Sequence, residues 1–249
     1  MVKFMLKIYM TDTYEAMSQK AAGIVAANIV LKPNCVLGLA TGSSPIGLYR
    51  ELITKCRSGE VDFSHVKSVN LDEYVGMAPE NPQSYHRYMQ ENLFNHVNID
   101  PANTHIPDGL AENLVDECNR YDRVIYSLGR IDVQVLGIGH NGHIGFNEPA
   151  EEFPVNTYVV NLQEGTRQAN SRFFASEDEV PRQAVTMGLR SIMQAQQILL
   201  VVSGESKAEI VRDAFMGPVT PRLPASILQM HPCVTLVGDQ AALSKLCDI

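Results

Sequence analysis

Short runs of apolar residues alternate along this chain with longer stretches in which apolar positions recur at helical spacing. That alternation is typical of parallel strands joined by helices. It predicts strands at residues 35–40, 66–71, 131–138, 197–202 and 234–237, and helices at residues 45–56, 84–95, 113–128, 181–193 and 205–216. The predicted fold class is therefore α/β, with a doubly wound, mostly parallel sheet.

Three of these strands are followed by loops rich in polar residues and glycines, at residues 41–44, 72–76 and 139–149. Open parallel sheets bind ligands beyond the carboxyl ends of their strands, so the three loops are expected to converge on one site. No linker or internal repeat divides the chain. Residues 1–249 are therefore predicted to form a single catalytic domain, in which the irregular region 151–180 is a mobile lid.

The formal net charge of the chain is −8, and no basic run occurs in it. These features argue against a nucleic-acid partner and against binding to an anionic membrane. The apolar stretch 21–31 is too short and too polar to span a bilayer, and the first nine residues lack the order of a signal peptide. We therefore expect a cytoplasmic protein, in which an anionic substrate would need local positive groups.

The five cysteines are odd in number and include no CxxC pair, so neither a disulfide framework nor a zinc knuckle is predicted. Buried, reduced thiols are expected instead. His140 and His143 invite a metal site, but they belong to no HExxH pattern and to no cluster with ligand spacing. A metal stays a minor alternative, and neither a metal nor a cofactor is predicted.

The turn Thr41-Gly42-Ser43-Ser44 lies between a predicted strand and a predicted helix. Its hydroxyls and backbone N–H groups at a helix N-terminus favour an anion, and a phosphate is the natural ligand. The other interpretation is a plain helix cap, since Ser and Thr are preferred there with or without a ligand. The turn is neither a Walker P-loop nor a GxSxG elbow, and its residues alone leave both interpretations open.

Two adjacent carboxylates, Asp72 and Glu73, follow directly on the strand that ends at Leu71. Neighbouring side chains in such a strand-to-loop turn point in different directions, so one can face a cleft while the other serves the structure. A carboxylate in a desolvated cleft has a raised pKa and can abstract a proton next to a carbonyl, which suits Asp72. A solvated acidic turn is the alternative.

The segment GIGHNGHIGFNEP, residues 137–149, carries the densest signal in the chain. Its first three glycines have the G-x-G-x-x-G spacing of a dinucleotide site, but the glycines that follow and Pro149 disfavour the helix that such a site opens. His143 offers an imidazole that exchanges protons near neutral pH, with Asn141 and Glu148 in the same loop to orient it. A packed loop histidine is the alternative, although the glycines, which let the backbone approach a ligand, favour function.

The segments LGLATGSSPIGLY, NLDEYVG and GIGHNGHIGFNEP together resemble the glucosamine-6-phosphate deaminase family, and the likeness runs along essentially the whole chain. The family's fold is a Rossmann-like α/β domain that it shares with 6-phosphogluconolactonases. The GHIGFNEP stretch is similar to the deaminases, whereas lactonases carry a GHxAS loop. The lactonase is therefore the second hypothesis, and a non-catalytic sugar-phosphate sensor on the same fold is the third.

The resemblance implies that glucosamine 6-phosphate and water are converted to fructose 6-phosphate and ammonia, in the catabolism of N-acetylglucosamine. In that scheme His143 is similar to the family's ring-opening acid–base catalyst, supported by Glu148 and Asn141. Asp72 matches the base that moves a proton from C2 to C1. The phosphate would bind at Thr41, Gly42, Ser43 and Ser44, helped by two cations that match the family pattern, Arg172 and Lys207.

Two departures from the family's pattern change the expectation. Several members carry Asp where this chain has Asn141, and an amide cannot stabilise imidazolium by charge, so the orientation of His143 is expected to depend more on Glu148. Allosterically activated members carry an Arg-x-Lys segment and a longer C-terminus, whereas residues 157–161 are uncharged here and the chain stops at Ile249. We therefore expect a monomer that N-acetylglucosamine 6-phosphate does not activate.

Overall fold

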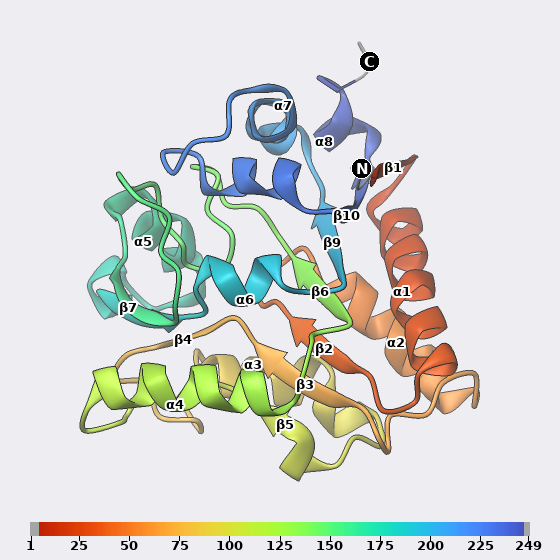
Figure 1. The fold of residues 1–249 in the computed structure, drawn as a ribbon, viewed down its shortest axis with the longest axis horizontal. Coiled ribbons are helices and arrows are strands. Elements are labelled where there is room, and N and C mark those ends of the chain that lie inside the picture. Colours follow the sequence, from red (N-terminus) through yellow and green to blue (C-terminus); the bar gives the residue numbers. More distant parts are fainter. Residues whose placement is uncertain (1–4, 247–249) are drawn as a thin grey trace.

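The computed structural model describes residues 5–246, and in this range a seven-stranded, fully parallel sheet forms the centre of the molecule (Figure 1). Across the sheet the strands are β1 (Met5–Thr11), β10 (Cys233–Asp239), β9 (Gln197–Val202), β6 (Val133–Leu136), β2 (Val36–Leu39), β3 (Lys67–Asn70) and β5 (Thr104–His105). The inner strands β6 and β9 are buried along almost their whole length because both of their faces are covered. The predicted α/β fold with a mostly parallel sheet is confirmed.

Helices cover both faces of the sheet; in Figure 1, α4 crosses in front of it and α3 lies behind it. The α-helices are α1 (Tyr14–Leu31), α2 (Ile46–Arg57), α3 (Tyr85–Asn92), α4 (Leu114–Ser127), α5 (Glu164–Asn170), α6 (Leu189–Met193), α7 (Ala208–Met216) and α8 (Gln240–Leu243). Short 3-10 turns are η1 (Phe94–His96), η2 (Pro101–Asn103), η3 (Ser171–Phe173), η4 (Glu177–Glu179), η5 (Glu205–Lys207) and η6 (Pro224–Met230). Most predicted elements are confirmed to within a few residues, with η5 and α7 together filling the helix predicted at 205–216.

A second, antiparallel sheet stands beside the first and consists of β4 (Asp72–Tyr74), β8 (Gln183–Thr186) and β7 (Tyr158–Asn161). The helix predicted at residues 181–193 is therefore wrong, because only α6 is helical there. The preceding residues Ala184, Val185 and Thr186 are fully buried between β4 and β7. Their pairing with both neighbouring strands outweighs the local helical spacing.

The order of the strands creates a switch point between β2 and β6. From β2 the chain builds outward through β3 to β5, and it then returns to the other side of β2 with β6, β9 and β10. At such a point the connections leave in opposite directions, and a crevice forms beyond the carboxyl ends of the strands. The loops after β2 and β6 contain two of the three sequence motifs, so the fold brings these motifs together.

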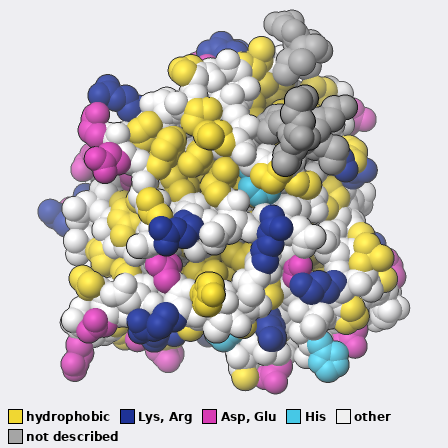
Figure 2. All heavy atoms as spheres, viewed as in Figure 1, with side chains coloured by type: hydrophobic (Ala, Val, Ile, Leu, Met, Phe, Trp, Pro, Cys, Tyr) yellow, Lys and Arg dark blue, Asp and Glu magenta, His cyan; other side chains and the backbone are white. Residues whose placement is uncertain are grey.

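The region 151–180 carries β7, α5 and the turns η3 and η4 rather than an irregular loop. This region contributes Leu162 to a small separate apolar cluster in which Tyr74 and Phe146 are also buried, with Tyr85 and Phe174 packed against them. No helix within residues 5–246 is long and apolar enough to cross a membrane. Figure 2 shows basic and acidic side chains interspersed on the face that it displays.

Candidate active site

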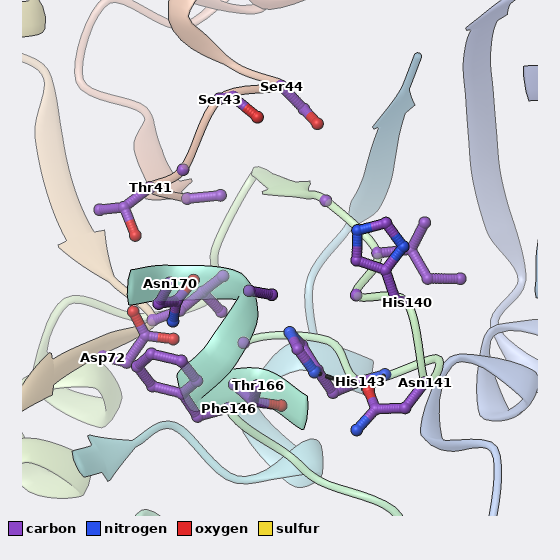
Figure 3. A pocket seen from close by; sticks show the side chains of 18 of the residues that line it. Thr41, Ser43, Ser44, Asp72, His140, Asn141, His143, Phe146, Thr166 and Asn170 are labelled. Carbon is purple, nitrogen blue, oxygen red and sulfur yellow. Dashed lines mark hydrogen bonds between the residues drawn. The ribbon is translucent and has the colours of Figure 1, made fainter. Parts of the chain in front are cut away.

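A cavity of about 520 Å³ opens at the carboxyl ends of the central strands (Figure 3). The loops after β2, β3, β6 and β9 form its walls, and α5 with the following turn covers it. Of the residues predicted from sequence, those lining it are Thr41, Gly42, Ser43, Ser44, Asp72, Asn141, His143, Arg172 and Lys207. Only Glu148 is set back, buried behind Asn141. The expected convergence of the three motif loops is confirmed.

Tyrosine hydroxyls fix the carbonyl groups of the turn after β2. Tyr88 donates to the carbonyl oxygen of Gly42 at 2.5 Å, and Tyr14 lies 3.1 and 3.2 Å from those of Ser43 and Ser44. Gly42 has φ of 87°, a left-handed conformation that favours glycine. With the carbonyls held by tyrosines, no described residue accepts a hydrogen bond from the N–H groups of residues 42–44.

The structure decides between the two interpretations of this turn. The N-cap residue of α2 is Pro45, which makes no side-chain cap, and the N–H of Gly47 in the first turn donates to the Tyr14 hydroxyl at 2.8 Å. Ser43 and Ser44 therefore do not act as a helix cap, and their hydroxyls lie on the cavity wall. The N–H groups of residues 42–44, which find no acceptor among the described residues and directly precede a twelve-residue helix, favour an anion together with the two hydroxyls.

The two predicted cations reach the same cavity from separate elements. Lys207, in η5, donates to the carbonyl oxygen of Ile138 at 2.8 Å. Burial and, second, the charge of Arg172 lower the pKa of Lys207 to about 8. The Arg172 guanidinium stacks over the Phe173 ring, 4.7 Å from its centroid. Two cations close enough for the charge of Arg172 to lower the pKa of Lys207 form a site for a group with more than one negative charge.

Asp72 and Glu73 divide their roles between the cavity and the fold. Asp72 lines the cavity, is 5% exposed, and receives no hydrogen bond from any described residue. Burial and, second, the charge of Glu73 raise the pKa of Asp72 to about 8. Glu73 instead accepts hydrogen bonds from the backbone N–H groups of Tyr85 and His86 at the start of α3, both at 3.0 Å. Asp72 is therefore a carboxyl group with the proton affinity of a general base near neutral pH.

The glycine-rich loop presents the His143 ring to the cavity and supports it from behind. The Asn141 Oδ1 atom lies 2.7 Å from His143 Nδ1, and Asn141 Nδ2 donates to Glu148 Oε2 at 2.6 Å. Glu148 also faces His143 Nδ1 directly, at 3.7 Å. Burial opposes ionisation of Glu148, but the hydrogen bond and charge of His143, with Thr166 and Asn141, outweigh it, so its pKa lies below the ordinary value. Glu148 is therefore an anion that supports His143 directly and through an amide.

Glycine is required where this loop folds back under the imidazole. A Cβ atom on Gly139 would lie 2.3 Å from Cε1 of His143 and 2.4 Å from both ring nitrogens. The backbone N–H of Gly139 donates to the carbonyl of His143 at 2.9 Å, which closes the turn. The ring therefore rests directly on the backbone of residue 139.

Several residues that line the cavity were not predicted from sequence: Tyr85, Phe146, Gln163, Thr166, Asn170, Ser203 and Ser206. Phe146 lay inside a motif, but four others belong to α3 and to the covering segment, which has no motif of its own. Asn170 donates to the Tyr74 hydroxyl at 3.0 Å and so ties this segment to β4. His140 also lines the cavity, and burial with the charges of Lys207, Arg172 and His143 lowers its pKa. Within residues 5–246 no group of three or more His, Cys, Asp or Glu side chains gathers as for a metal ion.

The chain is similar to a known family along nearly all of its length. The family model described as glucosamine-6-phosphate isomerases/6-phosphogluconolactonase matches residues 10–236. A glucosamine-6-phosphate deaminase from Lachnoclostridium phytofermentans is 54% identical over 93% of this chain and 98% of its own length. The enzyme of that name from Thermoanaerobacter pseudethanolicus is 53% identical over 98% of this chain and 96% of its own.

Solved structures agree with this likeness. A protein described as a monomeric glucosamine-6-phosphate deaminase superposes with a TM-score of 0.94 at 48% identity, covering 96% of this chain and 99% of its own. The 6-phosphogluconolactonase from Trypanosoma brucei superposes with a TM-score of 0.75 at 18% identity, over 98% of this chain and all of its own. The second match shows a shared fold alone.

Proposed function

The chain belongs to the family of glucosamine-6-phosphate isomerases and 6-phosphogluconolactonases, and we propose that within it the protein is an enzyme that converts glucosamine 6-phosphate and water to fructose 6-phosphate and ammonia. Relatives that share more than half of its residues along almost the full chain are glucosamine-6-phosphate deaminases. The lactonases share the fold at much lower identity. The deaminase is therefore the function that the relatives support.

One observation carries the proposal within the site: the cavity has two chemically different ends. Ser43 and Ser44 lie at one end in Figure 3, and Asp72 and His143 lie at the other. We assign the phosphate to the first end, with Arg172 and Lys207 as its cations, and the reacting carbons to the second. A sugar phosphate fits both ends of the cavity, because it carries an anionic phosphate on one side and reacting sugar carbons on the other.

In the first step of the proposed reaction His143 opens the sugar ring. Its Nε2 atom takes the proton of the O1 hydroxyl, the C1–O5 bond breaks as the C1 carbonyl forms, and the imidazolium returns a proton to O5. Glu148 stabilises the imidazolium by charge, and Asn141 holds the ring in place.

In the second step the Asp72 carboxylate removes the C2 proton, which gives an enolamine, and returns it to C1. The resulting C2 imine adds water and releases ammonia, which leaves the ketone of fructose 6-phosphate. The pKa of about 8 suits this role, because the carboxyl group must both take and return the proton near neutral pH.

The same proposal covers the state and setting of the enzyme. We propose one catalytic domain over the whole chain, a monomer like the solved relative, with residues 151–180 as a lid that moves to admit substrate. We place it in the cytoplasm, where it would act in N-acetylglucosamine catabolism without activation by N-acetylglucosamine 6-phosphate. A phosphorylated sugar does not cross a bilayer unaided, which supports that location.

The decisive experiment is ammonia release from glucosamine 6-phosphate by the purified protein. The deaminase releases one ammonia for each fructose 6-phosphate formed. Hydrolysis of 6-phosphogluconolactone without ammonia release would favour the lactonase instead. Tight binding of the sugar phosphate without any turnover would favour a sensor.

A further inference from the structure

The side chain of Gln163 joins the segment over the cavity to the residues that hold His143. Gln163 is the N-cap residue of α5 and lines the cavity. Its Nε2 atom donates to the carbonyl oxygen of Pro149, and its Oε1 atom accepts from Asn141 Nδ2, both at 3.2 Å. Its backbone N–H donates to Glu148 Oε1 at 3.3 Å. The start of the covering helix therefore contacts both partners of the imidazole.

The donor and acceptor atoms in these contacts can be assigned in only one way. A backbone carbonyl only accepts hydrogen bonds, so Gln163 must turn its NH₂ group toward Pro149 and its oxygen toward Asn141. Asn141 must then donate from its own NH₂ group, which leaves its oxygen facing Nδ1 of His143. The proton of a neutral imidazole is thereby placed on Nδ1, and Nε2 keeps the lone pair that a general base needs.

An amide alone does not secure this arrangement, because rotation by 180° exchanges its oxygen and nitrogen. A flipped Asn141 would present its NH₂ group to His143 and select the wrong tautomer. Three contacts oppose the flip. The Glu148 carboxylate and the Gln163 oxygen each accept from one hydrogen of the NH₂ group, and the backbone N–H of His143 donates to the Asn141 oxygen at 3.2 Å. Of these, only Gln163 belongs to the segment that covers the cavity.

We propose that Gln163 is a positioning residue for ring opening, which holds the Asn141 amide in the orientation that keeps Nε2 of His143 unprotonated when α5 covers the cavity. This inference rests on the proposed deaminase function. It makes Gln163 a partner specific to an amide at residue 141. A carboxylate there has no hydrogen for the Gln163 oxygen, and a Gln163 amide turned round to donate to it would lose its hydrogen bond to the Pro149 carbonyl.

The test compares Gln163→Leu with Gln168→Leu, a matched change on the exposed side of the same helix, where the side chain makes no hydrogen bond among the described residues and does not line the cavity. Nitrogen-15 NMR of histidine-labelled protein, with His143 assigned from His143→Gln, reports which ring nitrogen carries the proton. Wild type and Gln168→Leu are expected to show the Nδ1–H form, and Gln163→Leu a mixture of tautomers. Of the two solvent-exposed side-chain hydrogen bonds that Gln163→Leu removes, loss of the one to Asn141 should lower kcat/KM for glucosamine 6-phosphate about threefold to tenfold. Affinity for 2-amino-2-deoxyglucitol 6-phosphate, an analogue with no ring to open, should stay unchanged.

A double-mutant cycle that combines Gln163→Leu with Asn141→Asp is the second test of the proposal. In that background the Gln163 oxygen has lost its donor, so Gln163→Leu should cause no further loss of kcat/KM. Equal losses in both backgrounds, or an unchanged His143 tautomer in Gln163→Leu, would overturn the positioning role while leaving the deaminase function intact. A wild-type protein that releases no ammonia would instead refute the proposed function itself.

Discussion

The carboxylates of Asp72 and Glu73 are neighbours on β4, yet one faces the cavity and the other caps α3. The division follows from the strand geometry, which sends adjacent side chains to opposite faces. It also couples the two groups, because the charge of Glu73 is the second cause, after burial, of the raised pKa of Asp72. The structural carboxylate therefore helps to set the proton affinity of the proposed base.

The first prediction concerns the pH dependence of catalysis. Asp72 must lose its proton to act as a base, so kcat/KM should rise with pH through about 8. Glu73→Gln removes the neighbouring charge and should shift this rising limb to lower pH, although burial keeps the pKa of Asp72 above its ordinary value. The measurement is kcat/KM against pH, with the exposed residue Glu60, beyond the far end of α2, changed to Gln as the control. An unshifted limb in Glu73→Gln would show that another group limits the rate.

The second prediction separates turnover from binding at Asp72. Asp72→Asn keeps the shape of the side chain but removes the base, so kcat should fall by several orders of magnitude with little change in substrate affinity. Steady-state kinetics measure kcat, and a binding titration with the analogue 2-amino-2-deoxyglucitol 6-phosphate measures affinity. A large loss of affinity with normal kcat would contradict the assignment of Asp72 as the base.

The same variant should change stability in a pH-dependent way. The pKa of Asp72 is raised from 3.8 to about 8 on folding, so its contribution to stability is fully present below about pH 4 and is lost as pH rises through 8. Asn is neutral at every pH. Asp72→Asn should therefore match the wild type in acid and exceed its Tm increasingly up to about pH 8. A constant Tm difference across this range would show that Asp72 does not titrate in the folded protein as the structure indicates.

A fourth prediction assigns the opposite limb of the pH profile to Lys207. The pKa of Lys207 is lowered to about 8, so its charge, and with it the affinity for the phosphate, is lost as pH rises above that value. Lys207→Met should raise KM about tenfold to a hundredfold below pH 8, the range expected for a charged hydrogen bond, and should abolish the rise of KM above pH 8. Lys245→Met, a change at a surface ion pair, is the control. A rise of KM above pH 8 that survives in Lys207→Met would assign it to another group.

The residues near the strand ends were predictable because each motif is continuous in sequence and the α/β pattern places strand ends at one edge. The places of Asp72 and His143 at the cavity therefore follow from the pattern, whereas the roles assigned to them come from the resemblance to a known family. The second sheet was not predictable, because the apolar spacing of residues 181–193 fits a helix as well as a strand followed by a short helix. Pairing with β4 and β7, which are distant in sequence, decides between them.

The beginning of the chain shows a second limit. No element was predicted for residues 5–31 apart from an apolar stretch, yet β1 and the eighteen-residue helix α1 lie there. The buried positions of α1 recur at Met17, Ala21, Val25 and Ile29, but the exposed Val30 and Leu31 blur that pattern. The role of Gln163 was likewise hidden, because it depends on where an amide points in the folded chain.

The last prediction uses the close contact between Gly139 and His143. An added Cβ at residue 139 would overlap the imidazole, which is held by Asn141 at 2.7 Å and has no freedom to yield without losing that bond. Gly139→Ala should therefore displace the ring and lower kcat/KM by about 10²- to 10⁴-fold, the contribution typical of a general acid–base group. Gly23→Ala, on the exposed side of α1 and away from the cavity, meets nothing within 4 Å and should change the rate far less. The turn at residues 41–44, to which we assign the phosphate, is untouched, so isothermal titration should find the same affinity of both variants for 2-amino-2-deoxyglucitol 6-phosphate. A Gly139→Ala enzyme with the wild-type rate would mean that ring opening does not need the imidazole in the position seen here, and His143 would lose its assigned role.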